Sequence, residues 1–222
     1  GHQAWDVGLH HADRFAGIIP EAGFPVHEGG ALTRYLYLQN AVPGLGIYSI
    51  VGELDGVVRP IVEEAHRRLE DLGVEARLTV VPGVGHGYYP SEDEKVFAWM
   101  EPRRRNPNPR SVFKRLHHLT QGRAWWVEVT ALAGPEWDSS KPVKLRGVFK
   151  PDISKAQVVE LARAQLAQDL PWVRASVDTD NLITVTAGGV ARLVVWLSPR
   201  LVDFSRPVRI EVNGSVLWEE VV

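Results

Sequence analysis

The chain has 222 residues, a net charge of −2 at pH 7 and a hydrophobic content of 45%, which are ordinary values for a globular protein. Both signs of charge are mixed throughout, which argues against nucleic acid or an anionic membrane as a partner. The chain has no cysteine, which excludes disulfides, thiolate zinc sites and a cysteine nucleophile but leaves the compartment open. No apolar stretch approaches about 18 residues, so we expect no transmembrane helix.

The first hundred residues alternate between helical and strand patterns. Residues 1–12 predict a helix, residues 15–20 a buried strand, and residues 31–42 a short helix. A further helix is predicted to begin at Ser91, with Glu94 as its capping-box partner, and to bury Val96, Phe97 and Met100 before Pro102 ends it. This order of elements predicts an α/β fold, the second half of a doubly wound parallel sheet whose first strands precede Gly1.

The stretch between residues 44 and 87 has the clearest pattern. Residues 44–52 and 76–81 are short apolar runs bounded by Gly and Pro, which are typical of parallel strands. Between them, apolar residues recur at helical spacing over residues 58–72, and Gly73 ends the helix. Because strand–helix–strand crossovers are right-handed, the two strands run parallel. The loops that follow them therefore meet at one edge of the sheet, where open α/β sheets bind ligands.

Each of these two loops presents one residue of catalytic type. Asp55 lies in the sequence GELDG, and His86 lies in GVGHG. A histidine that serves as general base needs an acceptor on its other ring nitrogen, which fixes the tautomer and stabilises the imidazolium. We therefore predict that Asp55 and His86 form an acid–histidine pair. The alternative is that both are ordinary turn residues.

The nucleophile that would complete a triad is missing from the chain. No serine stands in a G-x-S-x-G turn, Ser49 lies inside a predicted strand, and Ser91 lies at a predicted helix start. Such a turn places its serine directly before a helix, and this chain begins in a helix without an initiator methionine or signal peptide. We therefore expect a nucleophile a few residues before Gly1, and we expect the 222 residues by themselves to be inactive.

The motifs together resemble serine esterases of the α/β-hydrolase superfamily, in particular the phospholipase/carboxylesterase and prolyl-oligopeptidase-like groups. The opening GHQAWDVGLHHADRFAGIIPEAGFP is similar to the segment after the nucleophile, with Gly1, His2, Trp5 and Phe15 matching. At Gly8 and Ala12 the chain departs from the usual alanine and proline. Residues 52–55 match the G-x-x-D acid loop of these families, and residues 85–87 match their G-H-G histidine loop.

The resemblance covers residues 1–101 and implies a fold, an activity and site residues. It implies a carboxylic ester hydrolase, or alternatively a serine peptidase, that acts on a small ester or peptide substrate through an acyl-enzyme. In that mechanism His86 is the base for an upstream serine and Asp55 orients it, with no metal or organic cofactor. The backbone N–H after the nucleophile, which forms half of the oxyanion hole, lies outside the chain together with the serine.

Three further residues are candidates for the substrate pocket at the same edge. Glu21 follows the first predicted strand. Three roles are open to it: contact with the substrate, service as an alternative triad acid, or the ordinary role of a solvated loop residue. His2 lines the pocket near the serine or packs at the helix start. Tyr88, with Tyr89 beside it, follows His86 and is placed to wall a cleft.

A change of pattern after residue 102 predicts a second domain. Residues 103–110, RRRNPNPR, have no periodicity and indicate a linker rather than a phosphate-binding patch. We expect a partial hydrolase domain at 1–102 and a β-rich accessory domain at 111–222, which resembles a domain appended to some bacterial esterases. Ser154 and Gln157 predict a capping box for a helix at 154–168, and Asn213-Gly214 predicts a type I′ hairpin. Strands are predicted at 111–119, 124–132, 143–149, 172–177, 182–187, 192–197, 208–213 and 215–221.

Two other classes of function fit parts of the sequence. Six of the eight tryptophans follow residue 124, which is compatible with a glycan-binding platform on a degenerate, non-catalytic hydrolase scaffold. Small β domains, however, use tryptophan mainly in the core, and an extended Trp125-Trp126 sends only one ring inward. The pairs His10-His11 and His117-His118 invite a metal interpretation. Adjacent histidines point apart in a helix or a strand, so we expect neither pair to chelate an ion.

Overall fold

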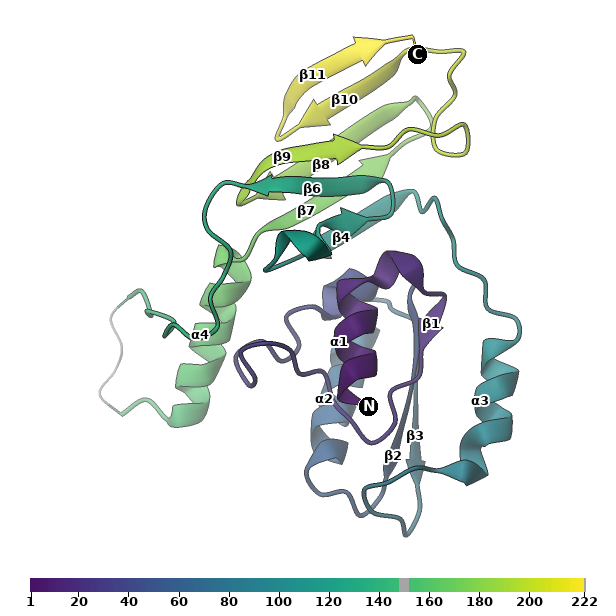
Figure 1. Ribbon diagram of the computed structural model, residues 1–222, viewed down its shortest axis with the longest axis vertical. Helices are drawn as coiled ribbons and strands as arrows, with labels where there is room; N and C mark the ends of the chain where they lie inside the picture. Colours follow the sequence, from purple (N-terminus) through teal and green to yellow (C-terminus); the bar gives the residue numbers. More distant parts are fainter. Residues whose placement is uncertain (148–151, 222) are drawn as a thin grey trace.

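The computed structural model of the chain describes residues 1–147 and 152–221. The described residues form a mixed α/β protein with four α-helices and three sheets. None of the described helices is long and apolar enough to cross a membrane. Figure 1 shows a first part built around a small parallel sheet and, above it, a second, β-rich part whose first strand follows the segment 103–110.

A three-stranded parallel sheet organises the first part. Its strands are β1 (Gly17–Ile18), β2 (Gly46–Gly52) and β3 (Ala76–Val81), in the spatial order β1-β2-β3. All three predicted strands are present, although β1 is shorter than its apolar run. Every residue of the central strand β2 is buried, as expected of a parallel strand with both faces covered.

Helices cover the two faces of this sheet. Helices α1 (His2–His10) and α2 (Val58–Asp71) lie on one face and α3 (Asp93–Met100) on the other (Figure 1). The side chains of β2 alternate accordingly: Ile47 and Val51 pack with α1 and α2, whereas Tyr48 packs with α3, its ring 5.6 Å from that of Trp99. The predicted helix–strand order is therefore confirmed over residues 44–81.

One helix prediction in this part is wrong, and a second is correct about the helix but wrong about its start and its buried face. Residues 31–42 form turns followed by a 3₁₀-helix, Leu38–Ala41, because Tyr35 has a φ of 73°, which no α-helix accommodates. Ser91 does not cap α3 but lies inside a 3₁₀-helix, Pro90–Glu92. Helix α3 then begins at Asp93, which turns Phe97 and Met100 toward solvent, 67% and 47% exposed, while Val96 packs against the sheet.

Two antiparallel-rich sheets form most of the second part. One has the order β11-β10-β8-β7-β4 and the other the order β5-β6-β9, and Figure 1 shows the second lying over the first. Helix α4 (Lys155–Asp169) projects from one end of the sheets. A short 3₁₀-helix in this part covers Leu119–Gln121, and another, in the first part, follows α1 at Ala12–Arg14. The strands are β4 (Ser111–Arg115), β5 (Arg123–Ala124), β6 (Val127–Leu132), β7 (Trp172–Val177), β8 (Leu182–Gly188), β9 (Val190–Val195), β10 (Val208–Val212) and β11 (Ser215–Glu220).

The local signals in this part give mixed outcomes. Ser154 and Gln157 form the predicted capping box of α4. Asn213 and Gly214 both have positive φ, 50° and 81°, as a type I′ turn requires. A strand at 143–149 was expected, but residues 143–147 form none, and residues 148 and 149 lie outside the described residues.

The prediction for Trp125 and Trp126 is also wrong, because both rings are buried, 7% and 3% exposed. Trp125 has a φ of 55° and lies in the turn between β5 and β6, so strand alternation does not apply to the pair. Each indole N–H donates to a carbonyl of the connecting segment 103–110: Trp125 to Asn106 at 3.0 Å and Trp126 to Pro109 at 2.8 Å. Both rings are therefore core residues and neither is open to a glycan.

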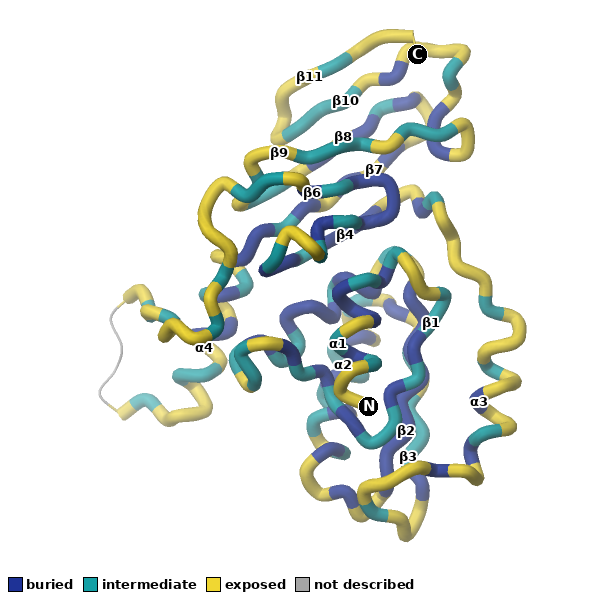
Figure 2. Tube along the Cα trace, viewed as in Figure 1, coloured by how far each residue is buried: buried dark blue, intermediate teal, exposed yellow. Residues whose placement is uncertain are grey.

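The two parts share one continuous apolar core, and Figure 2 shows buried chain on both sides of the junction. Asn40 pairs with β4 at the edge of its sheet, since its side-chain amide donates to Arg115 O at 2.9 Å and accepts from Arg115 N at 2.8 Å. This pairing covers backbone groups that an edge strand otherwise leaves exposed. Lys114 is 2% exposed and its ammonium donates to His10 O, at the end of α1.

A half-buried histidine beneath β2 makes the stability of the fold depend on pH. The Nε2 of His66 lies 2.8 Å from Ser49 Oγ, and burial lowers the pKa of His66 to about 4. In the unfolded chain this histidine titrates at its ordinary pKa of about 6.5. Between these two values the unfolded chain binds a proton that the folded protein does not, so the stability present above about pH 6.5 is lost as the pH falls toward the folded pKa.

We therefore predict that His66 accounts for a loss of about 1–2 kcal/mol in the free energy of unfolding between about pH 7 and about pH 5. Urea denaturation at the two pH values measures this loss in the wild type and in His66→Gln, which does not titrate. The variant should lose less stability on acidification, whereas His2→Gln, at an exposed position, should behave as the wild type. An equal loss in wild type and His66→Gln would contradict the prediction.

Candidate functional site

Three loops and one helix start meet at the carboxyl edge of the parallel sheet. The loops are residues 21–24 after β1, 53–56 after β2 and 82–87 after β3. The start of α1 packs against the first loop so tightly that a Cβ on Gly1 would lie 2.1 Å from Glu21 O. The His2 Nδ1 atom lies 3.0 Å from Phe24 O in the same loop. This convergence is the one that the parallel strands predict.

Asp55 and His86 lie in direct contact at this edge. The His86 Nδ1 atom is 2.7 Å from Asp55 Oδ2. The other carboxylate oxygen of Asp55 accepts a hydrogen bond of 3.0 Å from the backbone N–H of Val58, in the first turn of α2. The side chain of Asp55 is only 6% exposed, whereas that of His86 is 62% exposed. The Asp55 carboxylate is thus buried and fixed by the backbone of α2, whereas the His86 imidazole faces solvent.

The electrostatics of the pair select one tautomer of the histidine. Burial raises the pKa of Asp55, but hydrogen bonds from the Val58 N–H and from His86 outweigh it, and the net effect is a pKa below the usual range. Asp55 is therefore ionised near neutral pH and can only accept hydrogen bonds. The hydrogen between the two groups then belongs to His86 Nδ1, which leaves the lone pair on Nε2, the nitrogen that a general base uses.

Tyr89 holds the two loops together from inside. Its hydroxyl accepts from the Gly52 N–H at 2.8 Å and donates to Gly85 O at 3.2 Å. Gly52 is required at its position, because a Cβ there would lie 2.2 Å from Gly85 O and 2.3 Å from Val84 O. Leu54 N also donates to Val84 O, at 2.8 Å. These contacts fix the spacing between Asp55 and His86.

The sequence-based interpretation placed Tyr89 in the wall of a cleft, and this is wrong, since Tyr89 is 2% exposed. Tyr88 is the exposed member of the pair, and its hydroxyl donates to Asp93 Oδ2 at 2.6 Å. The pattern Tyr88-Tyr89 carries no signal that distinguishes the two. Only the direction of the chain between the His86 loop and α3 decides which ring turns inward.

The other predicted pocket residues lie at the edge but do not join the pair. Glu21 is half-buried and pairs with β2 through its backbone, and burial together with the nearby charge of Asp93 raises the pKa of its carboxyl. His2 is exposed and contacts Phe24 through ring and backbone. Among the described residues, neither Glu21, His2 nor Tyr88 is hydrogen-bonded to Asp55 or His86. The acid that contacts His86 is Asp55, not Glu21.

No serine or threonine hydroxyl of the described residues is hydrogen-bonded to His86. Ser49 is completely buried and bonded to His66 instead. A cavity of about 780 Å³ lies far from this edge, between the loop after β6 and α4, where its lining includes Trp137 and Gln165. The described residues thus place a carboxylate and an imidazole in direct contact at this edge.

Comparisons with known proteins add nothing to this geometry. No protein-family model matches the chain, and no curated protein matches it. The interpretation of the site therefore depends on its own distances, burial and hydrogen bonds.

We predict that Tyr89→Phe destabilises the fold and loosens the His86 loop. The variant leaves the buried Gly52 N–H without its acceptor, which should lower the free energy of unfolding by about 1–3 kcal/mol. Urea denaturation measures the loss, and NMR of the His86 ring nitrogens reports whether the bond to Asp55 persists. Tyr88→Phe is the matched control, because that neighbouring ring is exposed, and it should change neither readout. Equal behaviour of the two variants would contradict the role of Tyr89.

Proposed function

We propose that Asp55 and His86 are the acid and the base of a serine hydrolase, a carboxylic ester hydrolase of the α/β-hydrolase type whose nucleophile belongs to chain preceding Gly1. The observation that carries this proposal is the 2.7 Å contact between Asp55 Oδ2 and His86 Nδ1, made by a buried carboxylate and an exposed imidazole. An acid behind a histidine whose second nitrogen faces outward is the arrangement of two thirds of a triad.

In this mechanism His86 accepts and then returns one proton in each of the two half-reactions. Its Nε2 accepts the proton of the serine hydroxyl as the oxygen attacks the ester carbonyl, and it then returns the proton to the departing alcohol. The resulting acyl-enzyme is hydrolysed when His86 takes a proton from water and the hydroxide displaces the serine, which regains its proton. Asp55 remains ionised throughout, holding the Nδ1–H tautomer and stabilising the imidazolium.

The start of α1 supports a nucleophile on the N-terminal side of Gly1. Because Gly1 lies against the loop after β1, a residue attached before it emerges at the same edge as His86. The N-terminal end of α1 carries the positive end of the helix dipole, which favours the negative oxygen of a tetrahedral intermediate. Gly23 is crowded by the same contact, since a Cβ there would lie 2.5 Å from His2 N.

The test uses the chain extended by its natural upstream residues, assayed by hydrolysis of p-nitrophenyl esters and by fluorophosphonate labelling. His86→Ala and Asp55→Asn should each lower kcat by about 10³–10⁴-fold, because without either group the nucleophile lacks a correctly protonated base. Asp71→Asn, an exposed carboxylate at the end of α2, is the matched control for Asp55→Asn and should leave kcat unchanged. The 222 residues alone should not be labelled.

Two outcomes would overturn the proposal. Wild-type turnover by His86→Ala in the extended, folded chain would exclude this histidine as the base. A residue without a hydroxyl at the upstream position would leave the pair with nothing to activate. That second result would favour a non-catalytic binding protein on a degenerate hydrolase scaffold. Trp196 in the β-rich part, which is 49% exposed, is then the tryptophan to test for glycan contact.

A further inference from the structure

A cluster of histidines and carboxylates lies where the first part meets the β-rich part, away from Asp55 and His86. We call Asp6, His10, His27, Glu28, His117 and His118 the histidine seam. The ring of His10 is centred 4.8 Å from that of His27 and 5.0 Å from that of His117, so the seam is continuous. Two groups of three have their potential metal-ligand atoms within 4.8 Å of one another: Asp6, His10 and His27, and Glu28, His117 and His118.

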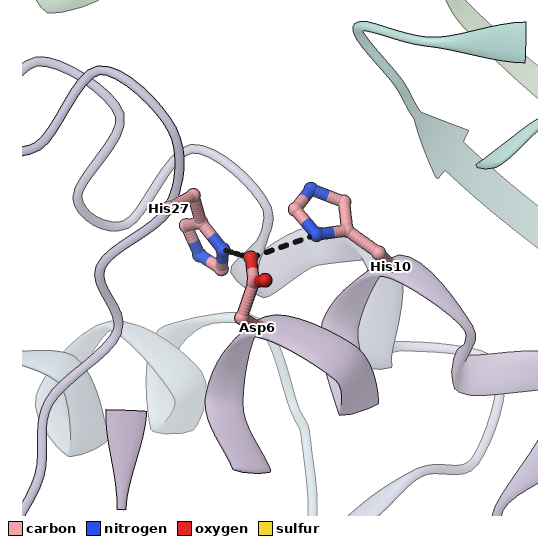
Figure 3. Close-up of side chains that lie close together, drawn as sticks. All are labelled: Asp6, His10 and His27. Atoms are coloured by element: carbon pink, nitrogen blue, oxygen red, sulfur yellow. Dashed lines mark hydrogen bonds and ion pairs between the residues drawn. The ribbon is translucent and has the colours of Figure 1, made fainter. Parts of the chain in front are cut away.

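The first group is arranged for hydrogen bonding rather than for a metal. Figure 3 shows the Nδ1 atoms of His10 and His27 both directed at Asp6 Oδ1, at 3.0 Å and 2.7 Å. Both rings are buried, and neither Nε2 atom has a hydrogen-bond partner among the described residues. A metal on the two Nδ1 atoms would need both hydrogens on Nε2, where nothing described accepts them. Metal-bound histidines almost always donate from the other ring nitrogen.

The second group has the ligand spacing of a metal site. Glu28 Oε2 lies 3.0 Å from His118 Nε2 and 3.7 Å from His117 Nε2. Zinc binds nitrogen and oxygen at about 2.0–2.2 Å in a tetrahedron, which places neighbouring ligand atoms about 3.3–3.5 Å apart. The two distances lie on either side of that value, and one potential ligand atom from each of the three residues lies within 4.8 Å of the others.

Each potential ligand of this group also makes a hydrogen-bonding contact through its other polar atom, which orients the side chain. His118 Nδ1 lies 2.9 Å from Glu136 Oε2, and His117 Nδ1 lies 2.7 Å from the Tyr37 hydroxyl. The second carboxylate oxygen of Glu28 accepts from Ser139 Oγ. A carboxylate that accepts from the second ring nitrogen, as Glu136 does, is a usual support of a metal-bound histidine, and the Tyr37 hydroxyl can also accept such a bond. Gln121 Nε2 lies 3.3 Å from His117 Nε2, and an ion would replace this contact.

The expectation that adjacent histidines diverge fails here because of the local backbone. His117 and His118 follow β4 in a bend rather than lying in a strand or a helix. Their ring centroids are 4.4 Å apart, and both Nε2 atoms lie within 3.7 Å of Glu28 Oε2. His118 is part-exposed, at 32%, so an ion can reach the site from solvent. Glu28 and Glu136 also supply two negative charges that a divalent cation would balance.

We infer that Glu28, His117 and His118 bind one divalent transition-metal ion, with zinc as the reference ion and water as the fourth ligand. The ligands come from the loop before residue 30 and from the segment after β4, and their supports come from Tyr37 and from the loop after β6. The ion therefore joins the first part to the β-rich part. It lies at the junction, away from Asp55 and His86, and takes no part in the proposed hydrolysis.

The test is a titration of the EDTA-treated 222-residue chain with ZnCl₂ by isothermal calorimetry, followed by thermal unfolding with and without the ion. We expect one Zn²⁺ per chain and a rise in Tm, because an ion that binds only the folded state stabilises it. Co²⁺ in place of Zn²⁺ should give the intense visible absorption of a four-coordinate site. A chain that binds no Zn²⁺ would overturn the inference and leave a network of ion pairs around His118.

Substitutions assign the ion to its ligands. His118→Ala and Glu28→Gln affect part-exposed side chains, so the fold should persist by circular dichroism, while Zn²⁺ affinity falls by more than about 100-fold. Glu136→Gln removes only a support and should weaken binding by about 10–100-fold. His11→Ala, a histidine outside both groups, should bind as the wild type. Wild-type affinity in His118→Ala, or a loss in Asp6→Asn that Glu28→Gln does not share, would overturn the assignment.

Discussion

The acid–histidine pair depends on a close backbone contact between the end of β2 and the loop after β3. Gly52 lies so near the carbonyls of Val84 and Gly85 that no side chain fits between them. The Tyr89 hydroxyl, bonded to Gly52 N and Gly85 O, prevents the loops from separating. Asp55 leaves β2 three residues after this contact, and His86 follows it directly. Their 2.7 Å bond thus results from packing beneath the site as much as from the two side chains.

Much of this geometry could be predicted from the sequence, because the pattern of residues 44–81 is strongly periodic. Two apolar runs separated by an amphipathic helix predict parallel strands, and parallel strands place Asp55 and His86 at one edge. The distance between the two side chains could not be predicted. It is set by Gly52 and by the inward turn of Tyr89 rather than Tyr88, and no periodicity encodes either feature.

Three of the wrong predictions share a physical cause, which is irregular backbone in segments that look periodic. Tyr35 has a φ of 73° and interrupts the helix predicted for residues 31–42, while Trp125 has a φ of 55° and lets two neighbouring rings face inward. His117 and His118 lie in a bend, where the geometry that separates adjacent side chains in helices and strands does not apply. Each of these residues is then fixed by contacts with distant segments. His117 bonds to Tyr37, and Trp126 bonds to Pro109.

Helix α1 extends from the proposed active site to the histidine seam, so the two lie at opposite ends of one helix. Its nine residues rise by about 13 Å. Its N-terminus lies against the loop after β1, and His10, at its other end, lies in the seam. The helix dipole has opposite signs at the two places. The positive end faces the edge where the proposed reaction develops an anion, and the negative end, at His10 O, accepts a hydrogen bond from the ammonium of buried Lys114.

Strand β4 links this helix end to the inferred metal ligands. Lys114 belongs to β4 and anchors the helix, and the segment that follows β4 carries His117 and His118. An ion there would therefore act on how firmly the β-rich part holds α1, and not on the contact between Asp55 and His86 at the opposite end of the helix.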